Sequence, residues 1–118
     1  MATSESRIRV KRLGDVTQVE FVDRNILDEA NISAIGEEIN ALIEGQPNPK
    51  LVISFSNVEH LSSAALGTLI TINNRIRNRG QLRLCHIDPQ IHEIFVITRL
   101  VKLFQIHPTV EDAIKSLA

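Results

Sequence analysis

The chain has 118 residues, 43% of them hydrophobic, which is enough to bury the core of one domain but not of two. Its 13 Lys and Arg residues are balanced by 14 Asp and Glu residues, and the net charge of −1 excludes a general attraction to nucleic acid or to an anionic membrane. Four Phe residues, without Trp or Tyr, also exclude a platform for stacking unpaired bases. We therefore expect a single domain, residues 1–118, that recognises its partners through a local surface.

The first elements in chain order are a hairpin and a helix. Residues 7–11 and 16–22 alternate polar and apolar side chains on either side of a Gly-Asp turn, which predicts two antiparallel strands. Asp28 is then placed to cap a helix that ends at Gly45. Its inward residues recur at helical spacing and are Ile32, Ile35, Ile39, Leu42 and Ile43.

The next strand is the best candidate for the centre of the sheet. Residues 51–55 begin with an unbroken apolar run between turn signals, as expected of a strand covered on both faces. A second helix is predicted over residues 63–79, where Gly80 ends it and three arginines complement the negative end of its dipole. Its inward stripe consists of Leu66, Leu69, Ile70, Asn73 and Ile76.

A third helix follows the strand predicted over residues 81–87. Asp88 supplies its N-cap and Pro89 its first residue, and we expect the helix to run to about Leu100. The apolar residues that it turns inward are Ile91, Ile94 and Phe95.

The last part of the chain completes an alternating pattern. A short strand around residues 104–107 precedes a final helix, where Thr109 and Asp112 stand at the spacing of a capping box. Strands that alternate with helices imply right-handed crossovers and parallel pairing. The sequence thus predicts an α/β domain with a mixed, mostly parallel sheet, an N-terminal antiparallel hairpin and about four helices.

The loop after the central strand is the first place to look for a functional site. In open α/β sheets, ligands and partners meet the loops at the carboxyl ends of the strands. Here that loop leads to Ser62 and Ser63, whose hydroxyls open a helix beside unpaired backbone N–H groups and the positive end of the dipole. This position tolerates a phosphate and equally suits a serine that only caps the helix, so position alone leaves both roles open.

From residue 52 to residue 114, the chain resembles the STAS domain family of bacterial anti-sigma factor antagonists. That family typically shows a strand, an Asp-Ser-Ser/Thr-Gly-Leu/Ala-Gly motif that opens a helix, a glycine at the end of that helix, another strand, and a helix that starts at proline. The counterparts in this chain are Ser-Ser-Ala-Ala-Leu-Gly at residues 62–67, Arg79-Gly80, the strand at residues 82–85 and Pro89. The later segments Leu-Phe-Gln-Ile at residues 103–106 and Glu-Asp-Ala-Ile at residues 111–114 are also similar. The resemblance implies a STAS-like single domain.

The resemblance also implies a function. In that family, the serine after an acidic residue is phosphorylated by an anti-sigma factor serine kinase and dephosphorylated by a serine phosphatase. Alignment of Leu66-Gly67 with the family's Leu-Gly places the phosphorylated residue at Ser63, with Ser62 as the alternative. The chain is then expected to be an anti-sigma factor antagonist, a phosphoprotein that regulates transcription by partner switching. The lack of a disulfide framework and of an apolar signal segment predicts a cytoplasmic location.

Two residues depart from the family pattern. Ser62 stands where the family has an acidic residue, and Ala65 stands where it has glycine. The alanine is the milder change because helix interiors prefer it to glycine. The missing carboxylate leaves a second function open: a STAS-like sensory or scaffold domain without a phosphoserine, which binds a small ligand or other copies of itself. The sequence leaves the oligomeric state open.

A partner is expected to bind the serine loop and the first turns of the following helix, where small side chains let another backbone approach closely. The predicted contact residues are Asn57, His60, Ser62, Ser63, Ala64, Gly67 and Thr68.

Other kinds of chemistry lack the residues that they need. No Gly-x-Ser-x-Gly elbow surrounds the serines, and a response regulator would need an Asp where Asn57 and Glu59 follow the central strand. The four histidines are dispersed without ligand partners, and the lone cysteine, Cys85, lies in an apolar run that predicts packing. No apolar segment is long enough to cross a bilayer. We predict no catalytic residue, metal, cofactor, nucleic-acid partner or membrane contact.

Overall fold

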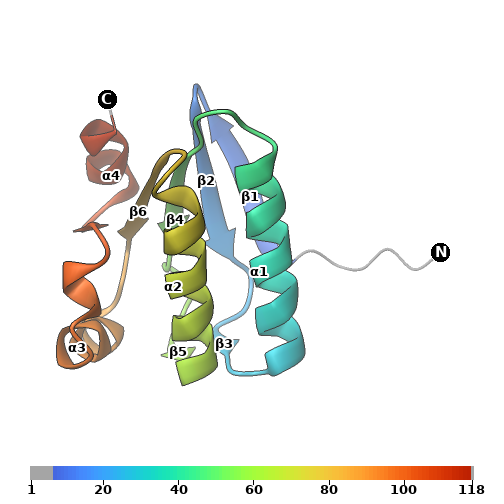
Figure 1. Ribbon diagram of the computed structural model, residues 1–118. Coiled ribbons are helices and arrows are strands. Elements are labelled where there is room, and N and C mark those ends of the chain that lie inside the picture. Colours follow the sequence, from blue (N-terminus) through green and yellow to red (C-terminus); the bar gives the residue numbers. More distant parts are fainter. Residues whose placement is uncertain (1–6, 118) are drawn as a thin grey trace.

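A computed structural model describes residues 7–117 and shows a five-stranded sheet with helices on both faces (Figure 1). The strand order is β1-β2-β4-β6-β7, in which β1 and β2 are antiparallel and all other neighbours are parallel. The predicted mixed sheet with an N-terminal hairpin is therefore confirmed. The strands are β1 (Ile8–Leu13), β2 (Val16–Phe21), β3 (Asn25–Ile26), β4 (Lys50–Ser54), β5 (His60–Leu61), β6 (Gln81–Cys85) and β7 (Ile106–His107).

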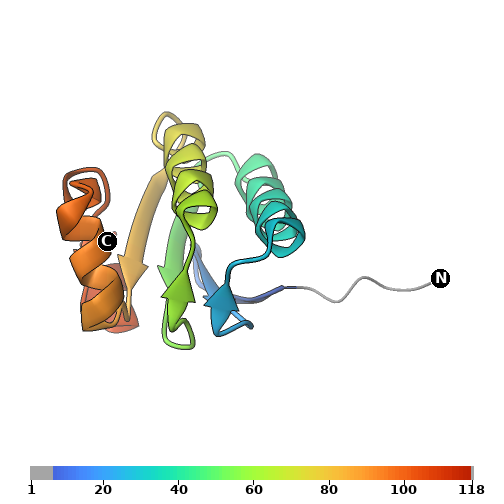
Figure 2. The same cartoon turned by 90° about the horizontal axis from the view of Figure 1, so that it is seen from below.

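Four α-helices surround this sheet, as predicted. They are α1 (Glu29–Glu44), α2 (Ser63–Ile76), α3 (Pro89–Ile97) and α4 (Val110–Ser116), and a 3₁₀ helix, η1 (Leu100–Lys102), follows α3. Figure 2 shows α1 and α2 side by side over one face of the sheet, with α3 beyond β6. Helix α4 covers the opposite face, where its Ala113 and Leu117 join Val16, Val52 and Cys85 in a small apolar cluster.

The predicted helix caps are present and explain where three helices begin. The side chain of Asp28 accepts a hydrogen bond from the backbone N–H of Asn31 at 3.4 Å, and Asp88 accepts one from Ile91 at 2.9 Å. Thr109 accepts one from the N–H of Asp112 at 3.1 Å. Each bond satisfies a backbone donor that the first helical turn leaves free, so these starts are fixed locally.

The core confirms the central position of β4. Leu51, Ile53 and Phe55 are buried in the main apolar cluster under α1 and α2, while Val52 is buried in the smaller cluster under α4. On α2, the buried residues are Ala65, Leu69, Ile72 and Ile76. The predicted stripe of this helix was thus partly wrong, because it omitted Ile72 and included Asn73, which is only half-buried.

Three elements end two or three residues earlier than predicted. Helix α2 stops at Ile76 rather than residue 79, since the N–H groups of Arg79 and Gly80 both turn back to the carbonyl of Ile76 at 2.9 and 2.7 Å. Helix α3 stops at Ile97 because Arg99 adopts a left-handed conformation with φ of 64°. Strand β6 stops at Cys85, and His86 follows with φ of 54°. The backbone leaves the regular conformation at the last two positions although neither residue is a glycine.

The sequence analysis missed a second, two-stranded sheet. In it, β3 and β5 pair in parallel, with Asn25 opposite His60 and Ile26 opposite Leu61. Two-residue strands carry no alternating pattern, and their partners are far apart in the chain, so no local signal predicts them. This small sheet ties the connection before α1 to the loop before α2 (Figure 1).

Candidate functional site

The loop between β4 and α2 is held in place by backbone hydrogen bonds along its whole length. At its start, the N–H of Phe55 donates to the carbonyl of Cys85 at 3.0 Å. Further along, the N–H of Glu59 donates to the backbone carbonyl of Arg24 at 2.7 Å. The N–H of Ser62 donates to the carbonyl of Ile26 at 3.1 Å. The loop therefore presents a defined surface at the start of α2.

The two serines have different roles in this surface. Ser62 is the N-cap of α2: its backbone is extended, and its Oγ accepts a hydrogen bond from the N–H of Ala65 at 3.1 Å. Ser63 is the first residue of the helix and is exposed, and its hydroxyl makes no hydrogen bond with the described residues. The capping role that the sequence left open between them thus falls to Ser62, and the hydroxyl of Ser63 is accessible.

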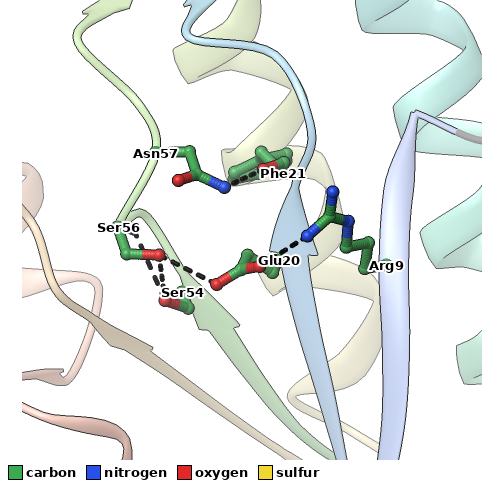
Figure 3. Close-up of polar contacts among 6 residues, drawn as sticks. All are labelled: Arg9, Glu20, Phe21, Ser54, Ser56 and Asn57. Carbon is green, nitrogen blue, oxygen red and sulfur yellow. Dashed lines mark hydrogen bonds and ion pairs between the residues drawn. The ribbon is translucent and has the colours of Figure 1, made fainter.

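A polar cluster fixes the first part of the loop, and sequence reasoning missed it (Figure 3). The hydroxyl of Ser56 donates to Glu20 at 2.9 Å and lies 3.4 Å from the Oγ of the buried Ser54. Glu20 also lies 4.0 Å from Arg9 across the β1–β2 hairpin. Because these residues come from three strands and the loop after β4, only their tertiary arrangement brings them together.

Asn57, one of the predicted partner contacts, belongs to the same cluster. Its side-chain amide donates to the backbone carbonyl of Phe21 at 3.2 Å (Figure 3). The bond joins the loop to the end of β2. The amide group thus has a structural partner, although the residue remains exposed.

The other predicted contacts lie around the start of α2. His60, Ser63, Ala64 and Gly67 are exposed, and a Cβ added at Gly67 would meet open space. Thr68 is half-buried, and its methyl carbon would lie 3.2 Å from a Cβ at Gly36 of α1. The side chain of Thr68 therefore contributes to the contact between α1 and α2.

Leu27 is an apolar residue at this surface that the sequence analysis did not single out. It is 55% exposed, and it follows Ile26, whose carbonyl accepts the hydrogen bond from Ser62. Its exposed apolar side chain is a candidate contact for a partner that packs over the start of α2. Its only sequence signal is its place before the cap Asp28.

The dipole of α2 favours negative charge at Ser63. The first turn of α2 contains no acidic residue, so nothing on the helix itself neutralises the positive end of its dipole.

A cleft of about 500 Å³ adjoins the loop and is lined by Glu59, His60, Asp88, Pro89 and Gln90. Glu59 forms an exposed ion pair with Arg24 at 3.7 Å.

Cys85 has the packing environment that the sequence predicted. The side chain is fully buried, and burial raises the pKa of its thiol to about 11. Its Sγ lies 3.8 Å from the carbonyl of Ile53. Among residues 7–117, no group of three or more His, Cys, Asp and Glu side chains is arranged to hold a metal ion. No helix in this part of the chain has the length and apolar character needed to cross a membrane.

Comparisons with known proteins agree with this architecture. The putative anti-sigma factor antagonist BtrV of Bordetella bronchiseptica is 23% identical over 91 residues, which cover 76% of this chain and 78% of BtrV. An anti-sigma-factor antagonist (STAS) domain protein from Planctomyces limnophilus superposes with a TM-score of 0.85 at 24% identity, covering 98% of this chain and 100% of that one. The phosphorylated form of SpoIIAA from Bacillus has a TM-score of 0.69 at 15% identity, covering 94% and 99%. These structural likenesses show a common fold.

The family assignment rests on a match along nearly the whole chain. The model of the STAS domain matches residues 7–113, from the first strand to the last helix. The parallel core, the opening hairpin and the serine-bearing start of α2 all lie within this match. The chain belongs to the STAS domain family.

Proposed function

We propose that this protein is an anti-sigma factor antagonist that binds an anti-sigma serine kinase and is released when Ser63 is phosphorylated. The observation that carries the proposal is that the two serines have different structural roles. Ser62 caps α2, while the hydroxyl of Ser63 is exposed beside it. The relationship to BtrV, a putative anti-sigma factor antagonist, supports the same function. Membership of the STAS domain family supports it further.

A phosphate on Ser63 is compatible with the fold. It adds a charge of about −1.5 to −2 at the positive end of a helix dipole, where negative charge is favourable. The capping bond from Ala65 to Ser62 does not involve Ser63, so phosphorylation leaves it in place. The same modification on Ser62 would compete with that bond, which favours Ser63 as the acceptor.

The phosphate lowers the stability of the complex with the partner more than that of the domain itself. A partner that packs over Ser63, Ala64 and Gly67 would have to bury a dianion, and an unpaired buried charge costs several kcal/mol. Binding is then switched off without unfolding the domain. A serine phosphatase would restore the binding state.

A second function rests on Ser62, which replaces the acidic residue of the family motif. If that carboxylate is needed to orient the acceptor hydroxyl, the protein is an unphosphorylated sensory or scaffold domain. It would then bind a small ligand or other copies of the chain. In both cases it acts by binding and has no turnover of its own.

The test is a titration of the protein with its cognate anti-sigma kinase, in ADP and in ATP. We expect tight binding in ADP, loss of binding in ATP, and a mass increase of one phosphate on Ser63. Ser63→Ala should bind in both nucleotides, and Ser63→Asp should bind weakly in both. Ser62→Ala is the matched control and should still accept the phosphate.

Three results would contradict the proposal. If Ser63→Asp binds like the parent and ATP still releases Ser63→Ala, the switch is not at Ser63. If the parent protein neither binds the kinase nor gains mass, the scaffold function stands instead. ATPase or esterase activity that Ser63→Ala abolishes would show that the protein is an enzyme.

A further inference from the structure

A second candidate site lies at the opposite end of the sheet from Ser63. The β1–β2 turn, the connection from α1 to β4 and the turn from α2 to β6 surround an open cleft of about 900 Å³ there. These three connections lie together at the top of Figure 1, whereas α2 begins at the bottom. The cleft is thus separate from the serine surface.

Cationic side chains from different elements converge on this cleft. Arg12 comes from β1, Lys50 from β4, and Arg77 and Arg79 from the end of α2 and the turn that follows. Within residues 7–117, Asp15 is the one carboxylate among its lining residues. The fold therefore concentrates positive charge here, although the whole chain has a net charge of −1.

The protein's own acceptors engage only part of this charge. Lys50 binds Asp15 at 2.9 Å, which also holds the pKa of that carboxyl below its ordinary value. Arg79 binds Glu44 at 2.9 Å and the carbonyl of Gln46 at 3.4 Å. The guanidinium groups of Arg12 and Arg77 are exposed and make no hydrogen bond or ion pair with the described residues.

The helix dipoles explain only some of these cations. Helices α1 and α2 both end near the cleft, and cations stabilise the carboxyl ends of helices. This accounts for Arg77 and Arg79, which follow α2 directly. It does not account for Arg12, which a strand brings to the same cleft and which has no carboxylate to pair with among the described residues.

The backbone at the base of the cleft is closely packed. A Cβ on Gly80 would lie 1.8 Å from the carbonyl oxygen of Pro49, so the turn after α2 rests directly against the connection before β4. The N–H of Gln81 also donates to that carbonyl at 2.9 Å. The segments that carry Lys50, Arg77 and Arg79 are therefore fixed relative to one another.

We infer that this cleft binds a small ligand with a diphosphate group, held by the guanidinium groups of Arg12 and Arg77. Guanidinium groups bind phosphate oxygens through paired, charge-assisted hydrogen bonds, and two of them suit two linked phosphates. The volume of the cleft is within the usual range for small-molecule sites, and its charged lining suits an anion better than an apolar ligand. Binding of this ligand would either leave the affinity of the serine surface for its partner unchanged or alter that affinity from the opposite end of the domain.

The experiment titrates the isolated protein with inorganic pyrophosphate, and separately with ADP, and follows backbone amide shifts by NMR. We expect saturable binding with the largest shifts at residues 12, 15 and 77–81. The variant R12Q/R77Q should lose at least about tenfold in affinity because it removes two charge-assisted contacts. Tighter binding of ADP than of pyrophosphate would identify a nucleoside diphosphate, and equal affinity an inorganic one.

The matched control is R99Q/K102Q, which removes the same charge from exposed positions that are not among the lining residues of the cleft. It should bind pyrophosphate like the parent protein. The inference is wrong if both double variants lose affinity equally, because the effect is then general charge attraction. It is also wrong if binding does not saturate, or if the largest shifts fall at the start of α2.

Discussion

The two ends of the sheet are built in different ways. At the carboxyl end, backbone hydrogen bonds and the Ser62 cap hold a surface of small side chains with one exposed hydroxyl and one exposed leucine. At the amino end, long charged side chains from separate elements surround an open cleft. The first end suits recognition by shape, which a single added charge can disrupt. The second suits recognition by charge, which salt screens.

The largest expected effect is at the amino end, where Gly80→Ala places a methyl group against the Pro49 backbone. Because backbone atoms on both sides cannot move freely, we expect the free energy of unfolding to fall by about 3 kcal/mol. Urea denaturation measures it. At the carboxyl end, Gly67→Ala meets open space in a helix and should raise the stability by up to about 1 kcal/mol. Equal changes in the free energy of unfolding for the two variants would contradict the difference in packing around Gly80 and Gly67.

Alkaline pH should loosen the support beneath the serine loop. Burial favours the neutral thiol of Cys85, so its folded pKa of about 11 exceeds the ordinary value of 9.0. The stabilisation is complete below pH 9.0 and is lost as the pH rises towards 11, by on the order of 2 kcal/mol. Denaturation curves of the parent protein and of Cys85→Ala, compared across this range, isolate the contribution. A parallel decline in both would assign the pH dependence to other groups.

Leu27→Ala tests whether the carboxyl-end surface includes the exposed leucine. We expect the dissociation constant for the kinase in ADP to rise about tenfold, since truncating an apolar anchor removes buried contact area. Stability should change by less than about 0.5 kcal/mol because the side chain is already 55% exposed. Val96→Ala, at a residue 50% exposed on α3, is the control and should leave binding unchanged. If Leu27→Ala binds the kinase with full affinity while Ser63→Asp does not bind, Leu27 is not part of the partner-binding surface.

The smallest effect separates the two serines. Ser62→Ala removes the cap of α2 and should lower the free energy of unfolding by about 1 kcal/mol. Ser63→Ala removes a hydroxyl without a bonded partner among the described residues and should change it by less than about 0.5 kcal/mol. Thermal unfolding of both variants measures the difference. The reverse order would show that Ser63 caps the helix in solution.

Much of the fold could be predicted because its signals are local. The caps at Asp28, Asp88 and Thr109 each contact a backbone N–H three residues later, so the sequence alone shows them. The hairpin follows from alternation, and the central strand from its apolar run. The ends of α3 and β6 were predicted too late, because the left-handed conformations of Arg99 and His86 have no glycine to signal them.

Less of the candidate site could be predicted, because most of it is assembled from distant segments. The resemblance drew attention to the serine pair, but position alone could not say which serine caps the helix. The cluster of Glu20, Ser54 and Ser56 depends on the register of β2 with β4. The segment that carries Leu27 lies against the serine loop only through the pairing of β3 with β5.

By itself, the sequence determined the order of the main-sheet strands and the four α-helices, the starts of those helices and the place of the serine pair at the opening of α2. These features depend on contacts within a few residues, where side-chain spacing and capping decide the conformation. The tertiary structure alone decided which strands are neighbours, where Leu27 lies, and that Arg12 and Arg77 line the same cleft. Such contacts join residues far apart in the chain, and they form only because burying the apolar faces of α1, α2 and α4 against the sheet fixes the positions of all the segments at once.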